Sequence, residues 1–344
     1  MHYFRPAQLI LTISAAFTAL AAPSNAATPQ VTTDIAPVYG LVAQVMKGVG
    51  TPSLIIRPGS DPHHYSLRPS EAENIENADI IFWIGTELTP WLKAGFRNLA
   101  GNAETISLLN APGITILEAG ENEHHHSAAH DTHDEHDKND KHDGHNGHDT
   151  HNGHDDYERH DSQDGHDKHD DHETIDPHVW LDPENARVWT RLIAQELSHH
   201  DPAHATAYQE NADRAEQEII SQKTRIDTIL ATQQMPPVFV QHAAFAYFEN
   251  RFNVQLAGAL YDRENEAPSP GHIAELHALT NNMPKACLLS ESSIANNVIS
   301  SVFENTDLLV REINPSGSAG TLSENAYIEL LTTLADSLED CAQH

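Results

Sequence analysis

The first part of the chain alternates short apolar runs with segments of helical periodicity. The run from Ile80 to Ile84 is almost continuously apolar, which is typical of a strand buried on both faces of a sheet. Ser70, followed by Glu73 three residues later, is a capping-box pattern and predicts a helix that begins at Ser70. The pattern predicts strands at residues 31–35, 53–57, 80–84 and 114–117, and helices at residues 37–48, 70–78 and 90–100. These repeated βα units indicate a parallel sheet covered by helices.

A long helical pattern follows in the second half of the chain. A helix is predicted over residues 184–198, and Asp201-Pro202 then supplies an N-cap and a first-turn proline for the next one. No glycine or proline interrupts this next pattern before Pro236, and about thirty helical residues span about 45 Å. Its apolar positions recur at helical spacing and are Tyr208, Ala212, Ala215, Ile219, Ile226 and Ile229. The pattern therefore predicts a rigid connector between two lobes.

The rest of the chain repeats the pattern of the first part. Strands are predicted at residues 238–240, 254–256, 286–289 and 308–310, and helices at residues 243–252, 271–281, 294–304 and 324–342. The predicted fold class is therefore α/β, with two lobes built on parallel-type sheets and joined by the long helix. Ligands of open α/β sheets bind in the cleft at the carboxyl ends of the strands. The predicted lobes cover residues 27–117 with 177–200, and residues 236–344, and the connecting helix covers residues 201–235.

Residues 118–176 differ from both lobes in composition. They contain 15 histidines and 20 Asp or Glu residues but only 4 Lys or Arg residues, with almost no aliphatic side chains. Such an insert cannot bury enough apolar surface to offset the entropy of ordering, so we predict that it is disordered without metal. Its histidine content indicates metal binding, with a purely solubilising segment as the alternative. The predicted auxiliary metal-binding residues are His124, His125, His126, His130, His133, His136, His142, His145, His148, His151, His154, His160, His166, His169 and His172.

The N-terminal residues have the pattern of a secretory signal peptide. Arg5 lies in a short polar start, residues 9–22 are apolar, and small residues surround Ala26. We expect cleavage after Ala26, which would remove residues 1–26 and leave the protein in the periplasm. An uncleaved membrane anchor is the alternative, although the apolar stretch is shorter than the roughly 20 residues of a spanning helix.

Charge and cysteine content narrow the possible classes of partner. The chain carries 51 Asp or Glu against 19 Lys or Arg, a formal net charge of −32. This charge repels nucleic acid and anionic lipid, so neither is an expected partner. Export to an oxidising compartment favours a disulfide between the only two cysteines, Cys287 and Cys341, with free thiols or a thiolate metal site as the alternatives.

Three histidines outside the insert occupy comparable positions relative to the predicted elements. His63 follows the second predicted strand, His178 follows the insert, and His242 follows the first strand of the second lobe. A single histidine beside a proline is more often a polar turn residue than a ligand, but Asp-Pro-His occurs twice, at residues 61–63 and 176–178. Proline restricts the backbone before each imidazole, and a nearby aspartate can orient the ring as carboxylates do at metal sites. We therefore predict a metal site formed by these three histidines.

Three stretches of the sequence resemble the signatures of cluster A-I metal-binding proteins, and in particular of ZnuA-type zinc receptors. They are Gly59-Ser-Asp-Pro-His-His-Tyr-Ser-Leu-Arg-Pro-Ser70, Asp176-Pro-His-Val-Trp-Leu-Asp-Pro183 and His242-Ala-Ala-Phe-Ala-Tyr-Phe248. The resemblance covers essentially the whole chain after the first 26 residues and includes the position of the insert. It implies two (βα)4 lobes joined by a backbone helix, a zinc ion held between the lobes, and a disulfide in the second lobe that matches Cys287 and Cys341. The ligands that it implies are His63, His178 and His242.

Two departures from this family pattern bear on the metal. Some zinc receptors of the family have a glutamate before the first ligand, where this chain has Pro62. Manganese-type relatives have an acidic residue where this chain has Asn314. Three neutral imidazoles suit Zn²⁺, whereas manganese prefers carboxylate oxygen, so zinc is the expected ion. Water is the expected fourth ligand, with Glu291 as a weaker candidate, and His64 is an alternative to His63.

The resemblance also implies a function. Proteins of this type capture zinc in the periplasm and deliver it to the permease of an ABC transporter, which works with its own ATPase, and we expect a monomer that is not an enzyme. Two other functions remain as alternatives. A zinc enzyme can use three histidines and a water, and a metal-binding adhesin or buffer would need the same ligands.

Overall fold

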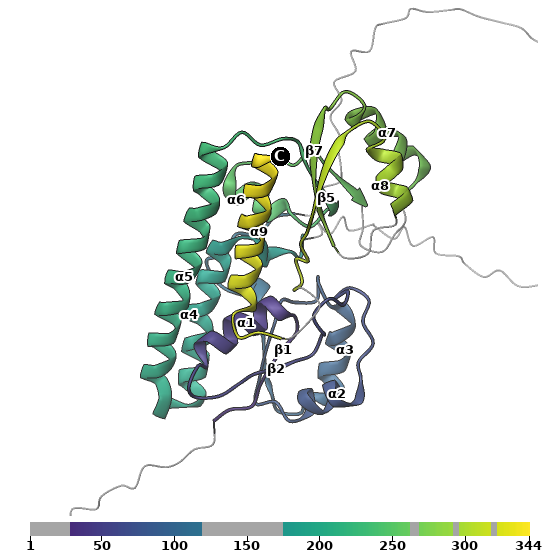
Figure 1. Ribbon diagram of the computed structural model, residues 1–344. Coiled ribbons are helices and arrows are strands. Elements are labelled where there is room, and N and C mark those ends of the chain that lie inside the picture. The colour runs from purple at the N-terminus through teal and green to yellow at the C-terminus, as the bar shows by residue number, and fades with distance from the viewer. Residues whose placement is uncertain (1–27, 119–174, 262–267, 292–295, 318–321) are drawn as a thin grey trace, which may run out of the picture.

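The structure, a computed structural model, describes residues 28–118, 175–261, 268–291, 296–317 and 322–344. These residues form two parallel β-sheets of four strands each, flanked by helices (Figure 1). The N-terminal sheet has the strand order β2 (Ser53–Leu54), β1 (Val31–Thr33), β3 (Ile80–Trp83) and β4 (Glu104–Ser107). The C-terminal sheet has the equivalent order β6 (Gly258–Tyr261), β5 (Val238–His242), β7 (Lys285–Ser290) and β8 (Asp307–Glu312). The predicted α/β fold with two parallel lobes is therefore confirmed.

The central strands of the N-terminal sheet are the most apolar. Strand β3 pairs in parallel with β1 on one side and with β4 on the other, and all four of its residues are buried. Strand β4 lies at the edge and exposes Glu104 and Thr105. A central strand of a helix-covered sheet has no face toward solvent, which explains why the apolar run at β3 has no polar alternation.

Two long helices run along one side of the molecule. Helix α4 (Pro183–His200) is followed by a 3-10 turn at Pro202–His204 and then by α5 (Ala205–Thr232), so the long helix starts one turn later than Asp201-Pro202 predicted. In Figure 1, α5 extends alongside both lobes. The buried residues of α5 include all six apolar positions of the predicted stripe, which confirms a connecting helix.

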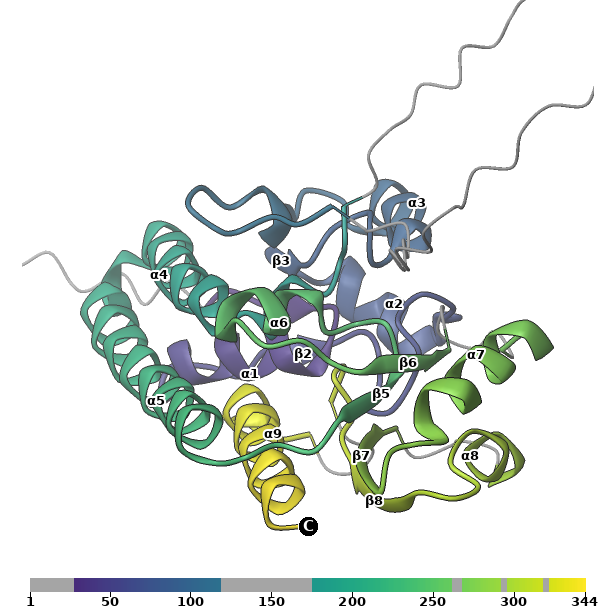
Figure 2. The ribbon, with the colours of Figure 1, turned by 90° about the horizontal axis from the view of Figure 1, so that it is seen from above.

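The remaining helices cover the sheets. In the N-terminal lobe they are α1 (Ala36–Val45), α2 (Pro69–Glu76) and α3 (Pro90–Leu99). In the C-terminal lobe they are α6 (Ala246–Phe252), α7 (Pro270–Thr280), α8 (Asn296–Val302) and α9 (Ala326–Gln343). Helix α1 is buried along its whole length because it contacts α4, α5 and α9, and Figure 2 shows these four helices gathered on one side. Within the described residues, no helix combines the length and the hydropathy that a membrane span requires.

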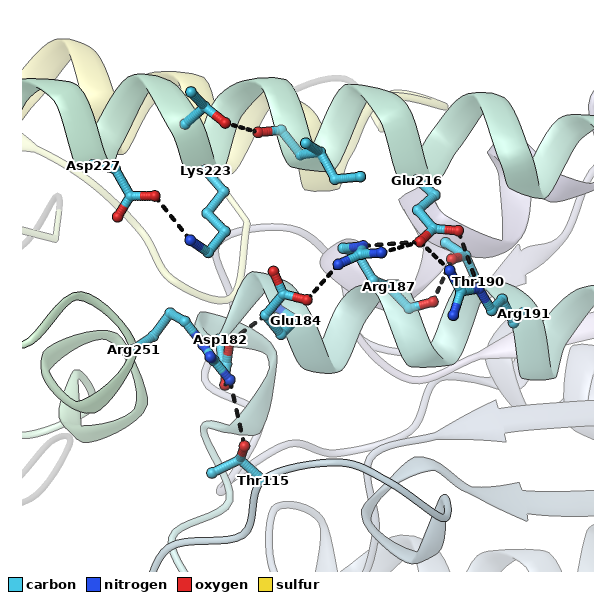
Figure 3. Close-up of polar contacts among 12 residues, drawn as sticks. Thr115, Asp182, Glu184, Arg187, Thr190, Arg191, Glu216, Lys223, Asp227 and Arg251 are labelled. Carbon is cyan, nitrogen blue, oxygen red and sulfur yellow. Dashed lines mark hydrogen bonds and ion pairs between the residues drawn. The ribbon is translucent and has the colours of Figure 1, made fainter.

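An ion-pair network joins α4 to α5 (Figure 3). Arg187 and Arg191, which lie one turn apart on α4, both donate to the carboxylate of Glu216 on α5. Arg187 also pairs with Glu184 at 2.5 Å. Burial acts to raise the pKa of the Glu216 carboxyl, but the two guanidinium groups outweigh it and lower that pKa. The network fixes the two long helices against each other.

The disulfide between Cys287 and Cys341 joins β7 to α9. Both cysteines are fully buried, and their Cα atoms lie 5.7 Å apart. Because α9 also packs against α1 and α5, the C-terminal helix connects the C-terminal sheet to the helices beside the N-terminal lobe. The predicted disulfide is confirmed.

The strand predicted at residues 114–117 is wrong, and β4 takes its place in the sheet. Side chains from other segments satisfy the backbone of residues 114–117. The N–H of Thr115 donates to the side chain of Asn185 at 2.7 Å, and the N–H of Leu117 donates to the hydroxyl of Tyr247 at 2.9 Å. Ile114 and Leu117 of this loop therefore pack against the core without joining a ladder, whereas Ile116 is exposed.

The strand predicted at residues 254–256 is also wrong, because the strand that follows α6 is β6, two residues later. Both misplaced strands have an edge strand as their true counterpart. Strands β4 and β6 have polar or small residues, such as Glu104 and Gly258, where the prediction required an apolar run.

The predicted helix start at Ser70 is wrong by one residue. Helix α2 begins at Pro69, since proline is favoured in the first turn of a helix.

Two sets of predictions lie outside the described residues. They are the signal peptide at residues 1–26 and the 15 auxiliary histidines, from His124 to His172. The described ends of the insert, Glu118 and Ile175, form an isolated antiparallel bridge. The insert therefore leaves and re-enters the fold at one place, directly before Asp176.

Candidate metal site

Three histidines from separate segments lie together where the two lobes meet. His63 lies in the loop after β2, His178 directly precedes a 3-10 turn at Val179–Leu181, and His242 is the last residue of β5. The ring centroids of His63 and His178 are 5.6 Å apart, and those of His178 and His242 are 5.4 Å apart. The side chains of the second and third histidines are buried, since these residues are only 8% and 5% exposed. The structure thus brings the three predicted histidines together, with His178 in the middle.

The two Asp-Pro-His stretches fold into the same turn. The carboxylate of Asp61 accepts the backbone N–H of His63 at 2.7 Å. The carboxylate of Asp176 accepts the backbone N–H of His178 at 2.9 Å. An aspartate readily accepts a hydrogen bond from the backbone two residues later, and the intervening proline restricts the backbone between them. The local sequence is therefore sufficient to set the backbone before both imidazoles.

Carboxylates contact the Nδ1 atoms of two of the rings. Oδ1 of Asp176 lies 2.8 Å from Nδ1 of His178. Oε1 of Glu291 lies 2.5 Å from Nδ1 of His242. A carboxylate at Nδ1 leaves Nε2 as the ring atom that can bind a metal ion. Glu291, which the sequence suggested as a weak ligand, lies here behind the ring of His242. The side chain of Gln241 accepts the backbone N–H of Glu291 at 2.6 Å.

His64 occupies a different environment from His63. The side chain of His64 is 78% exposed, and its Nδ1 lies 3.2 Å from Oδ2 of Asp61. The ring of His63 is partly buried and lies edge-on to His178. The structure therefore favours His63 over His64 as the member of the cluster.

The electrostatic environment keeps His63 neutral. Burial lowers the pKa of the His63 ring to about 4, and the neighbouring imidazole of His178 acts in the same direction. The carboxylate of Asp61 opposes this shift without reversing it. A histidine must be neutral to bind a metal ion, so His63 is in its binding form throughout the neutral pH range.

The donors in this cluster suit a zinc ion. Histidine nitrogens bind zinc at about 2.0–2.1 Å in tetrahedral sites, and two rings bound in this way have centroids roughly 5 Å apart. The observed centroid distances of 5.4 and 5.6 Å are close to that spacing. In the part of the chain that the structure describes, no group of three or more His, Cys, Asp or Glu side chains has the geometry of a metal site. The three imidazoles are gathered here without forming a closed metal site.

Side chains outside the cluster hold its loops, and no pattern in the sequence predicts these contacts. Nε1–H of Trp91, on α3, donates to the carbonyl oxygen of Pro62 at 2.9 Å. Nε1–H of Trp180 donates to the carbonyl oxygen of Pro315 at 2.8 Å, and this bond crosses from the N-terminal lobe to the loop after β8. In that loop the side chain of Asn314 accepts a hydrogen bond within its own turn.

Comparison with known proteins supplies the family. A family profile described as ZnuA, zinc-uptake complex component A, periplasmic, matches residues 31–341. The chain belongs to the ZnuA family. The high-affinity zinc uptake system protein ZnuA of Paracoccus denitrificans is 36% identical over 338 residues, which cover 98% of each chain. ZnuA of Brucella abortus is 34% identical over 311 residues, which cover 90% of this chain and 91% of the relative.

Solved structures of related proteins share the fold of the chain. The periplasmic zinc-binding protein TroA from Treponema pallidum superimposes with a TM-score of 0.66 at 18% identity, covering 92% of this chain and 99% of TroA. A crystal structure of ZnuA superimposes with a TM-score of 0.66 at 18% identity, covering 92% of this chain and 98% of the other. The fold that the resemblance to ZnuA-type receptors implied is therefore confirmed.

Proposed function

We propose that the protein is a periplasmic receptor that binds Zn²⁺ between its two lobes and delivers it to the permease of an ABC transporter. The family supports this role, because its profile describes the periplasmic component of a zinc-uptake complex. Relatives from Paracoccus and Brucella carry the name of high-affinity zinc uptake proteins. The observation that carries the proposal is the gathering of His63, His178 and His242 from three segments and from both lobes.

In this proposal the three imidazoles are the protein ligands and a water molecule completes the tetrahedron. His178 and His242 bind through Nε2, since Asp176 and Glu291 contact their Nδ1 atoms. Carboxylates in that position raise the basicity of the ring and supply negative charge near a dication. Glu291 then assists His242 and is not a direct ligand.

The donor set also supports a choice among metals. Mg²⁺, Ca²⁺ and Mn²⁺ prefer oxygen ligands, so three imidazole nitrogens discriminate against them. Cu²⁺ binds nitrogen ligands more tightly than Zn²⁺ does. Exclusion of copper must therefore come from its low availability in the cell and not from the ligands.

Export, the insert and assembly complete the proposal. Residues 1–26 direct the chain to the periplasm and are removed. The histidines of the insert act as many weak sites that raise the zinc concentration near the cleft. The position of the insert supports this role, because the bridge between Glu118 and Ile175 lies next to Asp176, which orients His178. The receptor acts as a monomer.

Zinc stoichiometry tests the proposed function. A variant lacking residues 121–173 isolates the cleft from the insert, and it should retain one tightly bound zinc per chain after gel filtration in a weak chelator. Adding His178→Ala to this variant should abolish that zinc. Adding His204→Ala instead should leave the tightly bound zinc in place. The ring of His204 pairs with Asp201 at 2.6 Å, and this pair lies away from the cleft. Equal zinc content with and without His178 would reject the proposed site, and elemental analysis of the eluted protein gives the answer.

A further inference from the structure

Helix α6 of the C-terminal lobe contacts both ends of the segment that carries His178. This segment runs from Asp176 to Asp182, the N-cap residue of α4 in the N-terminal lobe. Tyr247 and Arg251 lie four residues apart on α6, so their side chains leave the helix on the same face. One face of one helix therefore reaches the segment before and after the proposed ligand.

Tyr247 holds the first end of the segment. Its side chain is fully buried, and its hydroxyl donates to the carbonyl oxygen of Asp176 at 2.9 Å. The same hydroxyl accepts the backbone N–H of Leu117 at 2.9 Å, so it joins the two chain segments that flank the insert. Asp176 in turn holds both the backbone N–H and the ring of His178. Tyr247 is therefore connected to the proposed ligand His178 through a single residue, Asp176.

Arg251 holds the other end of the segment (Figure 3). Its Nε and Nη2 atoms donate to the two carboxylate oxygens of Asp182, each at 2.6 Å, and Nη2 also lies 3.4 Å from Oγ1 of Thr115. Asp182 is 0% exposed and accepts the N–H of Glu184 at the start of α4. A buried carboxylate requires a partner charge, and here the C-terminal lobe supplies it to the N-terminal lobe.

Helix α6 is also joined directly to His242. That histidine ends β5, and only residues 243–245 separate it from the first residue of α6. A movement of α6 relative to the segment at residues 176–182 therefore changes the distance between the rings of His178 and His242, now 5.4 Å between centroids. We propose that Tyr247 and Arg251 are positioning residues that fix His178 relative to His242 and thereby slow the release of zinc. This inference rests on the proposed function, because it requires both histidines to be ligands.

The physical reason is preorganisation. A zinc site loses affinity when its ligands must first be ordered, since the binding free energy then has to offset the lost conformational freedom. Groups that orient a ligand from behind contribute about 10- to 100-fold to metal affinity. Tyr247 acts through the backbone of Asp176 and belongs at the lower end of that range, whereas Arg251 neutralises a buried charge and belongs at the upper end.

The experiment uses the full mature chain, loaded with zinc. The test variants are Tyr247→Phe, which removes one hydroxyl, and Arg251→Met with its conservative counterpart Arg251→Lys. Tyr208→Phe is the matched control for tyrosine, because Tyr208 is also fully buried and its hydroxyl donates to buried Asp201 at 3.0 Å.

Arg225→Met is the matched control for arginine. Arg225 joins α5 to α9 by ion pairs with Asp336 at 2.7 Å and Glu339 at 2.8 Å, and neither helix carries a proposed ligand. The first readout is the rate at which an excess of chromogenic chelator removes the tightly bound zinc. The second readout is the visible absorption of the Co²⁺-loaded protein, which reports the coordination geometry and does not follow from stability alone.

We expect Tyr247→Phe to accelerate zinc release on the order of tenfold, and Arg251→Met by up to about a hundredfold, with altered Co²⁺ bands in both. Arg251→Lys should recover part of the loss, because it restores the charge without the two-pronged geometry. Both controls should keep the rate and the spectrum of the unaltered chain, even if their melting temperatures fall. Tyr247→Phe and Arg251→Lys decide the matter if Arg251→Met does not fold.

Two results would overturn the inference. One is an unchanged release rate and Co²⁺ spectrum in Tyr247→Phe and both Arg251 variants. The other is an equal acceleration in the Tyr208 and Arg225 controls, which would mean that general destabilisation causes the effect. His178→Ala separates this failure from failure of the proposed function. If that variant keeps the tight zinc of the unaltered chain, the proposed site itself is wrong.

Discussion

The two Asp-Pro-His loops of the cleft share a sequence and a backbone turn but treat their histidines differently. Oδ1 of Asp176 contacts both the backbone N–H and the ring of His178, at 2.9 and 2.8 Å. Asp61 accepts the backbone N–H of His63 with one oxygen and contacts the exposed ring of His64 with the other, at 3.2 Å. The shared triplet therefore specifies the turn, and the loop of Asp61 differs in that its carboxylate also contacts a second imidazole, that of His64.

The difference continues in the packing around each loop. The loop of His178 is held from the C-terminal lobe by Tyr247, by Arg251 and by the bond from Trp180 to the loop after β8. The loop of His63 is held within its own lobe by Trp91. It also has a backbone bond to the C-terminal lobe, from the N–H of Gly59 to the carbonyl oxygen of Gly317 at 2.9 Å. We propose that the loop of His178, which has three side-chain contacts across the lobes, is the more firmly held of the two and that His63 is the proposed ligand that adjusts more readily to the ion.

The largest difference between the loops should appear when each histidine is removed. A four-ligand zinc site contributes about 10–16 kcal/mol, or about 2.5–4 kcal/mol per ligand, so His178→Ala should weaken zinc binding roughly a hundredfold to a thousandfold. His63→Ala should weaken it less, because His64 lies beside it and carries its own imidazole. Competition with a chelator of known affinity measures both. If the double variant His63→Ala, His64→Ala binds zinc as tightly as His63→Ala alone, then His64 does not take the place of His63 as a ligand.

The second difference concerns the aspartates. Asp176→Asn should weaken zinc binding about 10- to 100-fold, the usual effect of losing a carboxylate behind a ligand ring. Asp61→Asn should have a smaller effect, since its second oxygen contacts exposed His64. The same competition titration measures both variants. Equal losses in the two would show that both carboxylates support their loops in the same way.

The third difference is in the pH dependence of stability without metal. The pKa of His63 is lowered by burial to about 4, below the 6.5 of an unfolded histidine. Between these values the unfolded chain binds more protons at this residue than the folded chain does. The free energy of unfolding should therefore fall by up to about 1.4 kcal/mol per pH unit as the pH drops from 6.5 toward 4. Burial raises the pKa of Asp34 to about 7, which gives a slope of the opposite sign over the same range, so the difference between the unaltered chain and His63→Ala isolates the contribution of His63. Urea unfolding of both chains at several pH values measures this difference, and equal pH dependence in the two would contradict the expectation.

The smallest effect should come from His64 itself. Its side chain is 78% exposed, and exposed ion pairs such as its contact with Asp61 contribute about 0–1 kcal/mol. His64→Ala should therefore change zinc affinity by no more than about fivefold while His63 is present. Isothermal titration of the variant checks this expectation, and a large loss would make His64 the ligand in place of His63.

The sequence predicts the parts of this structure that depend on local pattern. The apolar run at β3 and the apolar stripe along α5 are predicted correctly. Each pattern lies within one continuous segment of the chain and can be recognised without knowing the partners of that segment. Strands β4 and β6 were missed because polar or small residues, such as Glu104 and Gly258, stand where an apolar run was expected, whereas the edge strands β2 and β8 overlap the predicted runs.

The same division applies to the site. The turns before His63 and His178 are local and follow from Asp-Pro-His. The contact of Glu291 with His242 spans 49 residues, and those of Tyr247 and Arg251 span about 70. Such contacts depend on how the lobes pack, so the spacing of residues along the sequence does not predict them.

Anomalous diffraction at the zinc absorption edge, from a zinc-loaded crystal of the chain lacking residues 121–173, would locate the zinc ion relative to the three histidines. We expect one strong peak in the cleft, about 2.0–2.1 Å from a ring nitrogen of His63, of His178 and of His242. A peak bound elsewhere, or these three rings turned away from a common point in the loaded protein, would contradict this expectation.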